Sequence, residues 1–180
     1  MDSRPPSLFV TTRRTMPKDD FFERFRALHE MDGKAPLSKT ERAEYDVVKE
    51  RFAEAICAAQ RLTVKPGTTA RSTFRVALLF KLVLTIDGAV QSTATSDVSA
   101  GGFSALLATA PSANAGDVRF EMFLTKAESI TGTARVLEVR SGNRGFFAIT
   151  ELKPAFVDRL ERFLFDEMMR QLVQAAVKPK

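Results

Sequence analysis

Two arginines lie four positions apart in the stretch Arg71-Ser-Thr-Phe-Arg75. Together, Arg71 and Arg75 could bind an anionic ligand. A guanidinium carries a planar fork of N–H donors, which matches the oxygens of a phosphate and can also stack on a flat ring. Lysine is a point charge without this fork and could not replace either arginine fully. The chemistry open to the pair is therefore the binding of a planar anion, for which a nucleotide is the obvious candidate.

The segment Asp97-Val-Ser99-Ala-Gly101-Gly102, later in the chain, is typical of a polar, glycine-rich turn. Its carboxylate and hydroxyl can hydrogen-bond, and glycines let a backbone turn tightly and approach a ligand without a Cβ. Between the arginines and this turn, Asp87-Gly88 is a strong signal for a two-residue β-hairpin. The hairpin carries the chain out and back, so we expect the turn to come near the arginines.

The elements that would position these residues are strands. After the breaker Pro66-Gly67, short apolar or alternating segments recur between turn signals, which predicts a small six-stranded barrel or sandwich. The expected strands are 76–86, 89–96, 103–108, 118–124, 129–140 and 145–152. The first of them is almost unbroken in its apolar residues, and we expect it to be buried on both sides.

Helices are predicted on either side of the strands. A first helix is expected over 17–31, and a second over 38–62 opens with a capping box formed by Ser38 and Glu41. Apolar residues follow in this second helix at spacings of three and four: Tyr45, Val48, Phe52, Ala55, Ala59 and Leu62. This seam fits packing against the rest of the chain or self-association. A last helix begins at Pro154, and its wide apolar face must be buried.

Composition and charge exclude several classes of protein. The chain has 180 residues, of which 44% are hydrophobic, enough for a core, but it contains no apolar run long enough to span a membrane. No secretory signal is recognisable, so a cytoplasmic location is expected. The net charge of +5 is spread along the chain, unlike the concentrated basic surface of a duplex-DNA binder.

Catalytic and metal chemistry are not expected either. The only cysteine, Cys57, lies in a helical pattern and is predicted to be a small packed residue. The only histidine, His29, is expected at the surface or its boundary, with no other metal ligands around it. The sequence shows no P-loop and no nucleophile beside a base, so we expect no enzyme, no cofactor and no metal site.

Taken together, the arginine pair and the later Asp-x-Ser-x-x-Gly turn resemble the two-part signature of the PilZ domain family, over roughly residues 68–165. The resemblance implies a six-stranded β-barrel followed by a helix, and cyclic di-GMP as the ligand. It also implies that the binding residues are Arg71, Arg75, Asp97, Ser99, Gly101 and Gly102. The arginines would take guanine O6 and N7 or phosphate, and Asp97 would accept from guanine N1–H and N2–H₂.

The resemblance also bears on stoichiometry, because in this family the residue before the first arginine influences whether one ligand or an intercalated pair is bound. Here that residue is Ala70, which is small and uncharged and offers no further guanidinium to stack, so a single ligand is expected.

These expectations define a domain plan. It consists of a flexible tail over 1–16, an N-terminal helical extension over 17–66, the PilZ-type barrel over 67–153, and a C-terminal helix and tail over 154–180.

The implied function is a non-enzymatic receptor that couples cyclic di-GMP binding to a change in helix arrangement or partner binding. The alternative is a nucleotide-independent interaction module in motility or surface-organelle assembly. In either case, the helices over 38–62 and 155–173 would contact a protein partner or a second copy.

Overall fold

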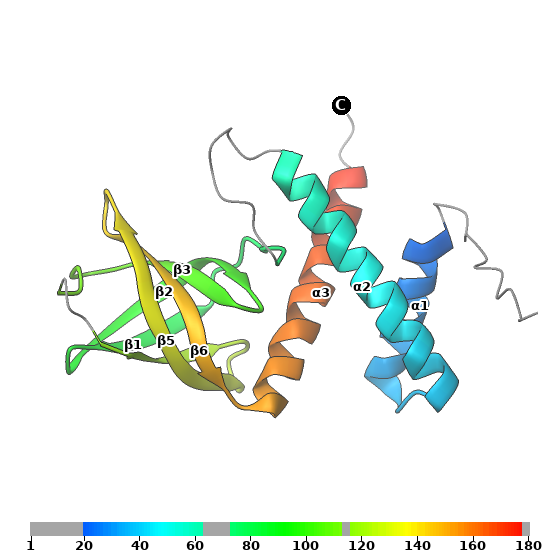
Figure 1. The fold of residues 1–180 in the computed structure, drawn as a ribbon, viewed down its shortest axis with the longest axis horizontal. Coiled ribbons are helices and arrows are strands. Elements are labelled where there is room, and N and C mark those ends of the chain that lie inside the picture. The colour runs from blue at the N-terminus through cyan, green and yellow to red at the C-terminus, as the bar shows by residue number, and fades with distance from the viewer. Residues whose placement is uncertain (1–19, 63–72, 113–115, 178–180) are drawn as a thin grey trace, which may run out of the picture. The chain divides into compact units, whose positions relative to one another are not determined.

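The computed structural model describes residues 20–62, 73–112 and 116–177 (Figure 1). The chain forms two compact units, residues 1–63 and 64–180. The elements are α1 (Asp20–Lys34), α2 (Lys39–Leu62), β1 (Lys81–Ile86), β2 (Ala89–Ser99), β3 (Gly102–Leu106), β4 (Val118–Phe123), β5 (Ser129–Arg140), β6 (Arg144–Leu152) and α3 (Pro154–Val177). The predicted tail over 1–16 and the breaker Pro66-Gly67 lie outside the described residues.

In the first unit, α1 and α2 form a helical hairpin with an aromatic core. The ring of Phe25 stacks on Phe52 with 4.5 Å between the centroids, and on Tyr45 at 5.9 Å. The capping box predicted at the start of α2 is confirmed. The backbone N–H of Ser38 donates to Glu41 Oε2 at 2.9 Å, and the backbone N–H of Glu41 donates to Ser38 Oγ at 3.3 Å. The two residues thus fix the beginning of α2.

The predicted apolar seam of α2 is buried only in its first half. Tyr45, Val48 and Phe52 are buried, whereas Ala55 and Ala59 are exposed. The rings of Tyr45 and Phe52 lie against α1, so packing within the chain accounts for that half. Cys57 is buried, as predicted for a small packed residue.

The expectation of a surface position for His29 is wrong, because this residue is only 2% exposed. Its ring stacks on Phe25 at 5.3 Å, and its Nδ1 lies 2.7 Å from the hydroxyl of Tyr45. The hydrogen bond satisfies a ring nitrogen that would otherwise be costly to bury. The histidine therefore belongs to the core of the helical hairpin.

The second unit contains a closed, antiparallel six-stranded barrel in the order β1-β2-β3-β6-β5-β4, which confirms the predicted fold class (Figure 1). The hairpin predicted at Asp87-Gly88 joins β1 to β2, with φ angles of 51° and 81° in the left-handed region. Inside the barrel, the ring of Phe103 lies 4.9 Å from that of Phe147 and 5.2 Å from that of Phe120.

Several strand boundaries differ from the expectation, most of all the start of β1 and the end of β2. β1 is six residues long and buries only one face, since Leu82 and Leu84 are buried while Val83 between them is partly exposed. A barrel wall has a single inner face, so the expected burial on both sides is wrong. The chain before β1 makes one isolated bridge, between Val76 and Val98. β2 continues to Ser99, which puts Asp97 in a strand rather than in a turn.

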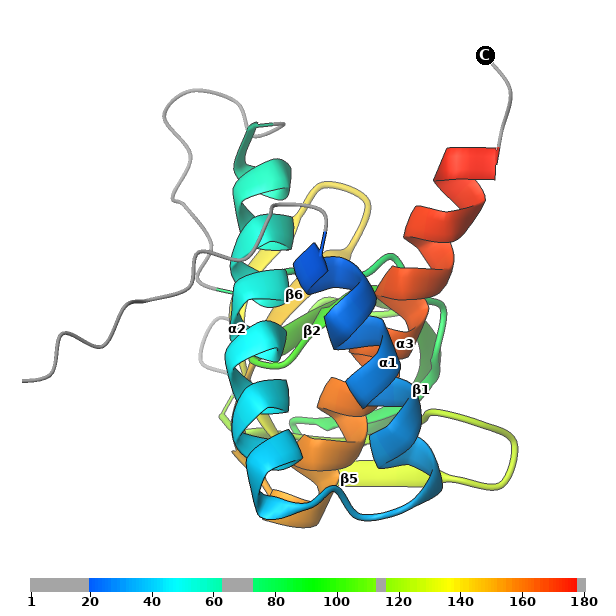
Figure 2. The same ribbon diagram turned by 90° about the vertical axis from the view of Figure 1, so that its right-hand side faces the viewer.

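Helix α3 begins at Pro154, as predicted, and runs across one side of the barrel (Figures 1 and 2). Its Phe165 ring lies 5.2 Å from that of Phe74, and its Phe163 ring lies 5.4 Å from that of Phe80. Arg159 Nε donates to Glu128 Oε1 at 2.9 Å. These contacts attach α3 to the segment that precedes β1 and to the loop before β5. No described helix is long and apolar enough to cross a membrane.

Candidate functional site

The outer face of β2, β3, β6 and β5 carries the predicted polar residues in rows across the strands. Residues directly opposite one another in a sheet project to the same face. The central row contains Asp97, Ser104, Phe146 and Glu138; the row on one side contains Ser99, Gly102, Ala148 and Arg135; the row on the other side contains Leu106, Arg144 and Arg140. The central row thus carries a carboxylate, a hydroxyl and an aromatic ring, with small residues in the row on one side and Arg144 and Arg140 in the row on the other.

Asp97 is the centre of a charged cluster on this face. Its Oδ1 accepts an ion-paired hydrogen bond from Arg75 Nη1. Its Oδ2 accepts from Ser104 Oγ at 2.5 Å and from Arg144 Nη2 at 3.2 Å. The side chains of Asp97 and Arg75 are each 18% exposed, so this pair is largely withdrawn from water. Val76 bridges Val98, which places Arg75 on the same face as Asp97.

The surroundings of Asp97 lower its pKa. Burial of the carboxylate raises the pKa, but the hydrogen bonds from Ser104 and Arg75 and the charges of Arg75 and Arg144 outweigh that effect. The pKa of Asp97 is therefore held below its ordinary value of 3.8, and the residue is a carboxylate at neutral pH.

Because its pKa is lowered on folding, Asp97 stabilises the protein above the pKa of the unfolded chain, and this contribution is lost as the pH falls through the lower folded-state pKa. We expect Asp97→Asn to have a lower free energy of unfolding than wild type at pH 7. The difference between the two proteins should shrink as the pH falls below 3.8, the ordinary pKa of the carboxyl. Urea denaturation of both proteins between pH 7 and about pH 2 measures it. A difference that is the same at every pH would contradict the ion-paired role of the carboxylate.

Ser99 and the two glycines form the connection from β2 to β3. Ser99 is 2% exposed, and its Oγ donates to the carbonyl of Gly102 at 3.1 Å. A Cβ at Gly102 would lie 2.2 Å from the backbone oxygen of Phe147, whereas a Cβ at Gly101 would meet nothing within 4 Å. Gly102 is thus required for the close approach of β3 to β6, and Gly101 is not.

The structure therefore brings together five of the six predicted binding residues: Arg75, Asp97, Ser99, Gly101 and Gly102. The sixth, Arg71, lies outside the described residues, as does Ala70. Among the described residues, no group of His, Cys, Asp or Glu side chains could hold a metal ion.

Sequence reasoning missed Arg144, which donates to Asp97 and also lies 3.4 Å from Ser104 Oγ. The turn Ser141-Gly142-Asn143 places Arg144 at the start of β6, and this much could be read from the sequence. The contact with Asp97 depends on the pairing of β6 with β3, which no local pattern reveals.

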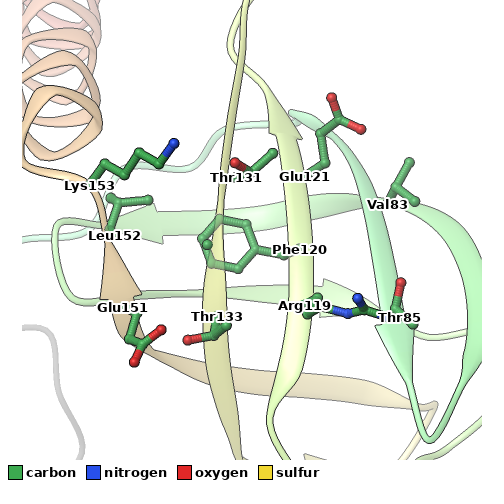
Figure 3. Close-up of a pocket in the computed structure, with 11 residues that line it drawn as sticks. Val83, Thr85, Arg119, Phe120, Glu121, Thr131, Thr133, Glu151, Leu152 and Lys153 are labelled. Atoms are coloured by element: carbon green, nitrogen blue, oxygen red, sulfur yellow. The ribbon is translucent and has the colours of Figure 1, made fainter.

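A groove of about 730 Å³ lies on another part of the barrel surface, over β1, β4, β5 and the end of β6 (Figure 3). Its lining residues are Val83, Thr85, Arg119, Phe120, Glu121, Thr131, Gly132, Thr133, Glu151, Leu152 and Lys153. Both signs of charge are present, and none of the predicted binding residues contributes to it. Arg119 in this groove is a suitable control position for variants of the arginines around Asp97.

Comparison with known proteins identifies the family. The protein-family model described as PilZ domain matches residues 69–166, which is more than half of the chain. The chain therefore belongs to the PilZ domain family. The resemblance inferred from the two-part motif is thus confirmed. Among curated protein sequences, none matches the chain significantly.

Several solved structures are similar to this chain. The PilZ domain of YcgR from Escherichia coli with c-di-GMP aligns with a TM-score of 0.48 at 18% identity, over 61% of this chain and 100% of that one. The Bacillus subtilis inhibitor of motility MotI/DgrA aligns with a TM-score of 0.48 at 20% identity, over 58% and 53%. The Borreliella burgdorferi PlzA protein in complex with c-di-GMP aligns with a TM-score of 0.40 at 12% identity, over 72% and 50%. The chain thus spans about half of the length of the latter two.

Proposed function

We propose that the protein is a receptor for cyclic di-GMP and not an enzyme, and that the ligand binds on the outer face of β2, β3 and β6. The observation that carries this proposal is the ionised, half-buried carboxylate of Asp97 between the guanidiniums of Arg75 and Arg144. A carboxylate can accept two hydrogen bonds from the N1–H and N2–H₂ groups of guanine. The guanidiniums can fork onto guanine O6 and N7 or pair with phosphate.

In the proposed mechanism, the ligand competes with Arg75 and Arg144 for the carboxylate of Asp97. A guanine edge bound to the carboxylate replaces at least one arginine there, and the released guanidinium turns to the phosphates of the same ligand. This exchange keeps every charge paired, which matters because an unpaired charge in such a partly buried position is costly. Arg71 would supply a further guanidinium from the segment before Arg75.

The contact of Phe74 supports coupling of ligand binding to a helix. Phe74 directly precedes Arg75, is buried, and packs its ring 5.2 Å from that of Phe165 on α3. A backbone change that moves Arg75 from Asp97 onto the ligand also moves Phe74. We therefore propose that occupancy of the site changes the packing of α3 and, through it, the surface offered to a partner.

Calorimetric titration of the full chain with cyclic di-GMP tests this function. We expect a dissociation constant in the micromolar range or below, about −8 kcal/mol or better. Cyclic di-AMP is the matched control, because adenine lacks the O6 acceptor and the N1–H donor of guanine and should bind far more weakly. Equal binding of both would contradict recognition of guanine by Asp97, and no binding of either would contradict the receptor function.

A further inference from the structure

β5 and β6 form a hairpin (Figure 1), and its side chains include a stacked aromatic and cationic group outside the predicted motif. The guanidinium carbon of Arg140 lies 4.5 Å from the ring centroid of Phe146, close enough for a cation–π contact. The same guanidinium is held by Glu138, which accepts from its Nε and Nη2 at 2.9 Å each. Arg140 thus contacts a ring on one side and a bidentate carboxylate at its edge.

This group is directly linked to Asp97. Phe146 pairs with Ser104, and Ser104 pairs with Asp97, so the backbones at Phe146 and Asp97 lie two strand spacings, about 10 Å, apart. Arg144 joins the two places, since it donates to Asp97 and lies with its guanidinium carbon 5.7 Å from the Phe146 ring centroid. A chain of contacts therefore runs from the carboxylate of Asp97 through Arg144 and Phe146 to the guanidinium of Arg140.

We propose that Arg140, held over Phe146, is a stacking surface for the second base of the dinucleotide whose first base is bound by Asp97. A nucleic-acid base stacks on a guanidinium plane as well as on an aromatic ring. Here the layers would be the phenyl ring, the guanidinium and then the base. Arg144 lies between the two base positions, where it can pair with a phosphate. This inference rests on the proposed receptor function.

The arrangement needs the plane of Arg140 and not only its charge. Glu138 is engaged by Arg140, so the pair adds little net charge to the surface, and attraction of phosphate alone would not explain the group. Phe146 acts through Arg140 and is a positioning residue, because Arg140 separates its ring from the ligand. The two side chains should therefore act as one unit on binding.

Titration of full-length variants with cyclic di-GMP tests the proposal. We expect Arg140→Lys, which keeps the charge and removes the plane, to bind about tenfold more weakly than wild type. Phe146→Leu should also weaken binding, and the double variant should be no weaker than Arg140→Lys, because the ring works through the guanidinium. The matched control is Arg119→Lys in the groove away from this face, which should bind within about twofold of wild type.

Two results would overturn the inference in distinguishable ways. If wild type binds and Arg140→Lys binds equally well, the stacking surface is refuted while the receptor function stands. If wild type binds no cyclic di-GMP, both fall. Arg140 is exposed, so its replacement leaves the barrel core untouched, and thermal unfolding of each variant checks this.

Discussion

The Arg75→Ala variant should bind cyclic di-GMP about 30- to 700-fold more weakly than wild type, a loss of about 2–4 kcal/mol. Arg75 is largely withdrawn from water and paired with Asp97, so its guanidinium lies directly beside the place where the ligand would bind. In the proposed exchange this guanidinium passes from the carboxylate to a phosphate of the ligand, so its donors stay paired in a partly buried position, where one arginine contributes strongly to affinity. Calorimetric titration at constant salt measures the change.

Two further variants show whether the effect comes from the fork of donors. Arg75→Lys keeps a positive charge beside Asp97 and should recover part of the affinity but not all of it. Arg119→Ala removes an exposed arginine on another part of the barrel and should leave the affinity within about twofold. A loss of less than about tenfold for Arg75→Ala would remove this residue from the site.

Gly102→Ala should lower the free energy of unfolding by about 2–3 kcal/mol. The added methyl carbon would lie 2.2 Å from the carbonyl oxygen of Phe147, well inside contact distance. That oxygen belongs to the backbone of β6, so relief requires moving β3 away from β6 and weakening the hydrogen bonds between them. Urea denaturation at neutral pH measures the loss.

Gly101→Ala is the matched control for this prediction. It adds the same methyl group one residue earlier, where nothing lies within 4 Å. Its stability should stay within about 0.5 kcal/mol of wild type, or rise slightly, because alanine reduces the freedom of the unfolded chain. Equal stability of the two variants would show that the close approach of the strands does not constrain position 102.

Features set by neighbouring residues were predictable from the sequence. The capping box of Ser38 and Glu41 and the hairpin at Asp87-Gly88 each depend on a few adjacent residues, and both are confirmed. The expected strand over 129–140 matches β5 from Ser129 to Arg140. The predicted number of strands, together with the two-part motif, was sufficient for the family and the barrel.

Features set by contacts between distant segments were not predictable. The burial of His29 depends on a hydroxyl sixteen residues away, on the other helix of the hairpin. The ion pair of Arg144 with Asp97 spans 47 positions and depends on β6 lying beside β3. Hydrophobic periodicity shows which side of a strand is buried but not which strand is its neighbour, so the edge of the site beyond Asp97 emerges only from the folded barrel.

β6 connects the site directly to α3, because almost no chain lies between the end of this strand and the start of the helix. Phe146 and Arg144 lie at the beginning of this nine-residue strand, and α3 starts at Pro154, two residues after the strand ends at Leu152. Nine extended residues span about 30 Å and have almost no slack, because a strand cannot lengthen without leaving its hydrogen-bonded neighbours. Under the proposed receptor function, a shift of β6 near Arg144 would therefore reach the first turn of α3, a second route beside the contact of Phe74 with Phe165.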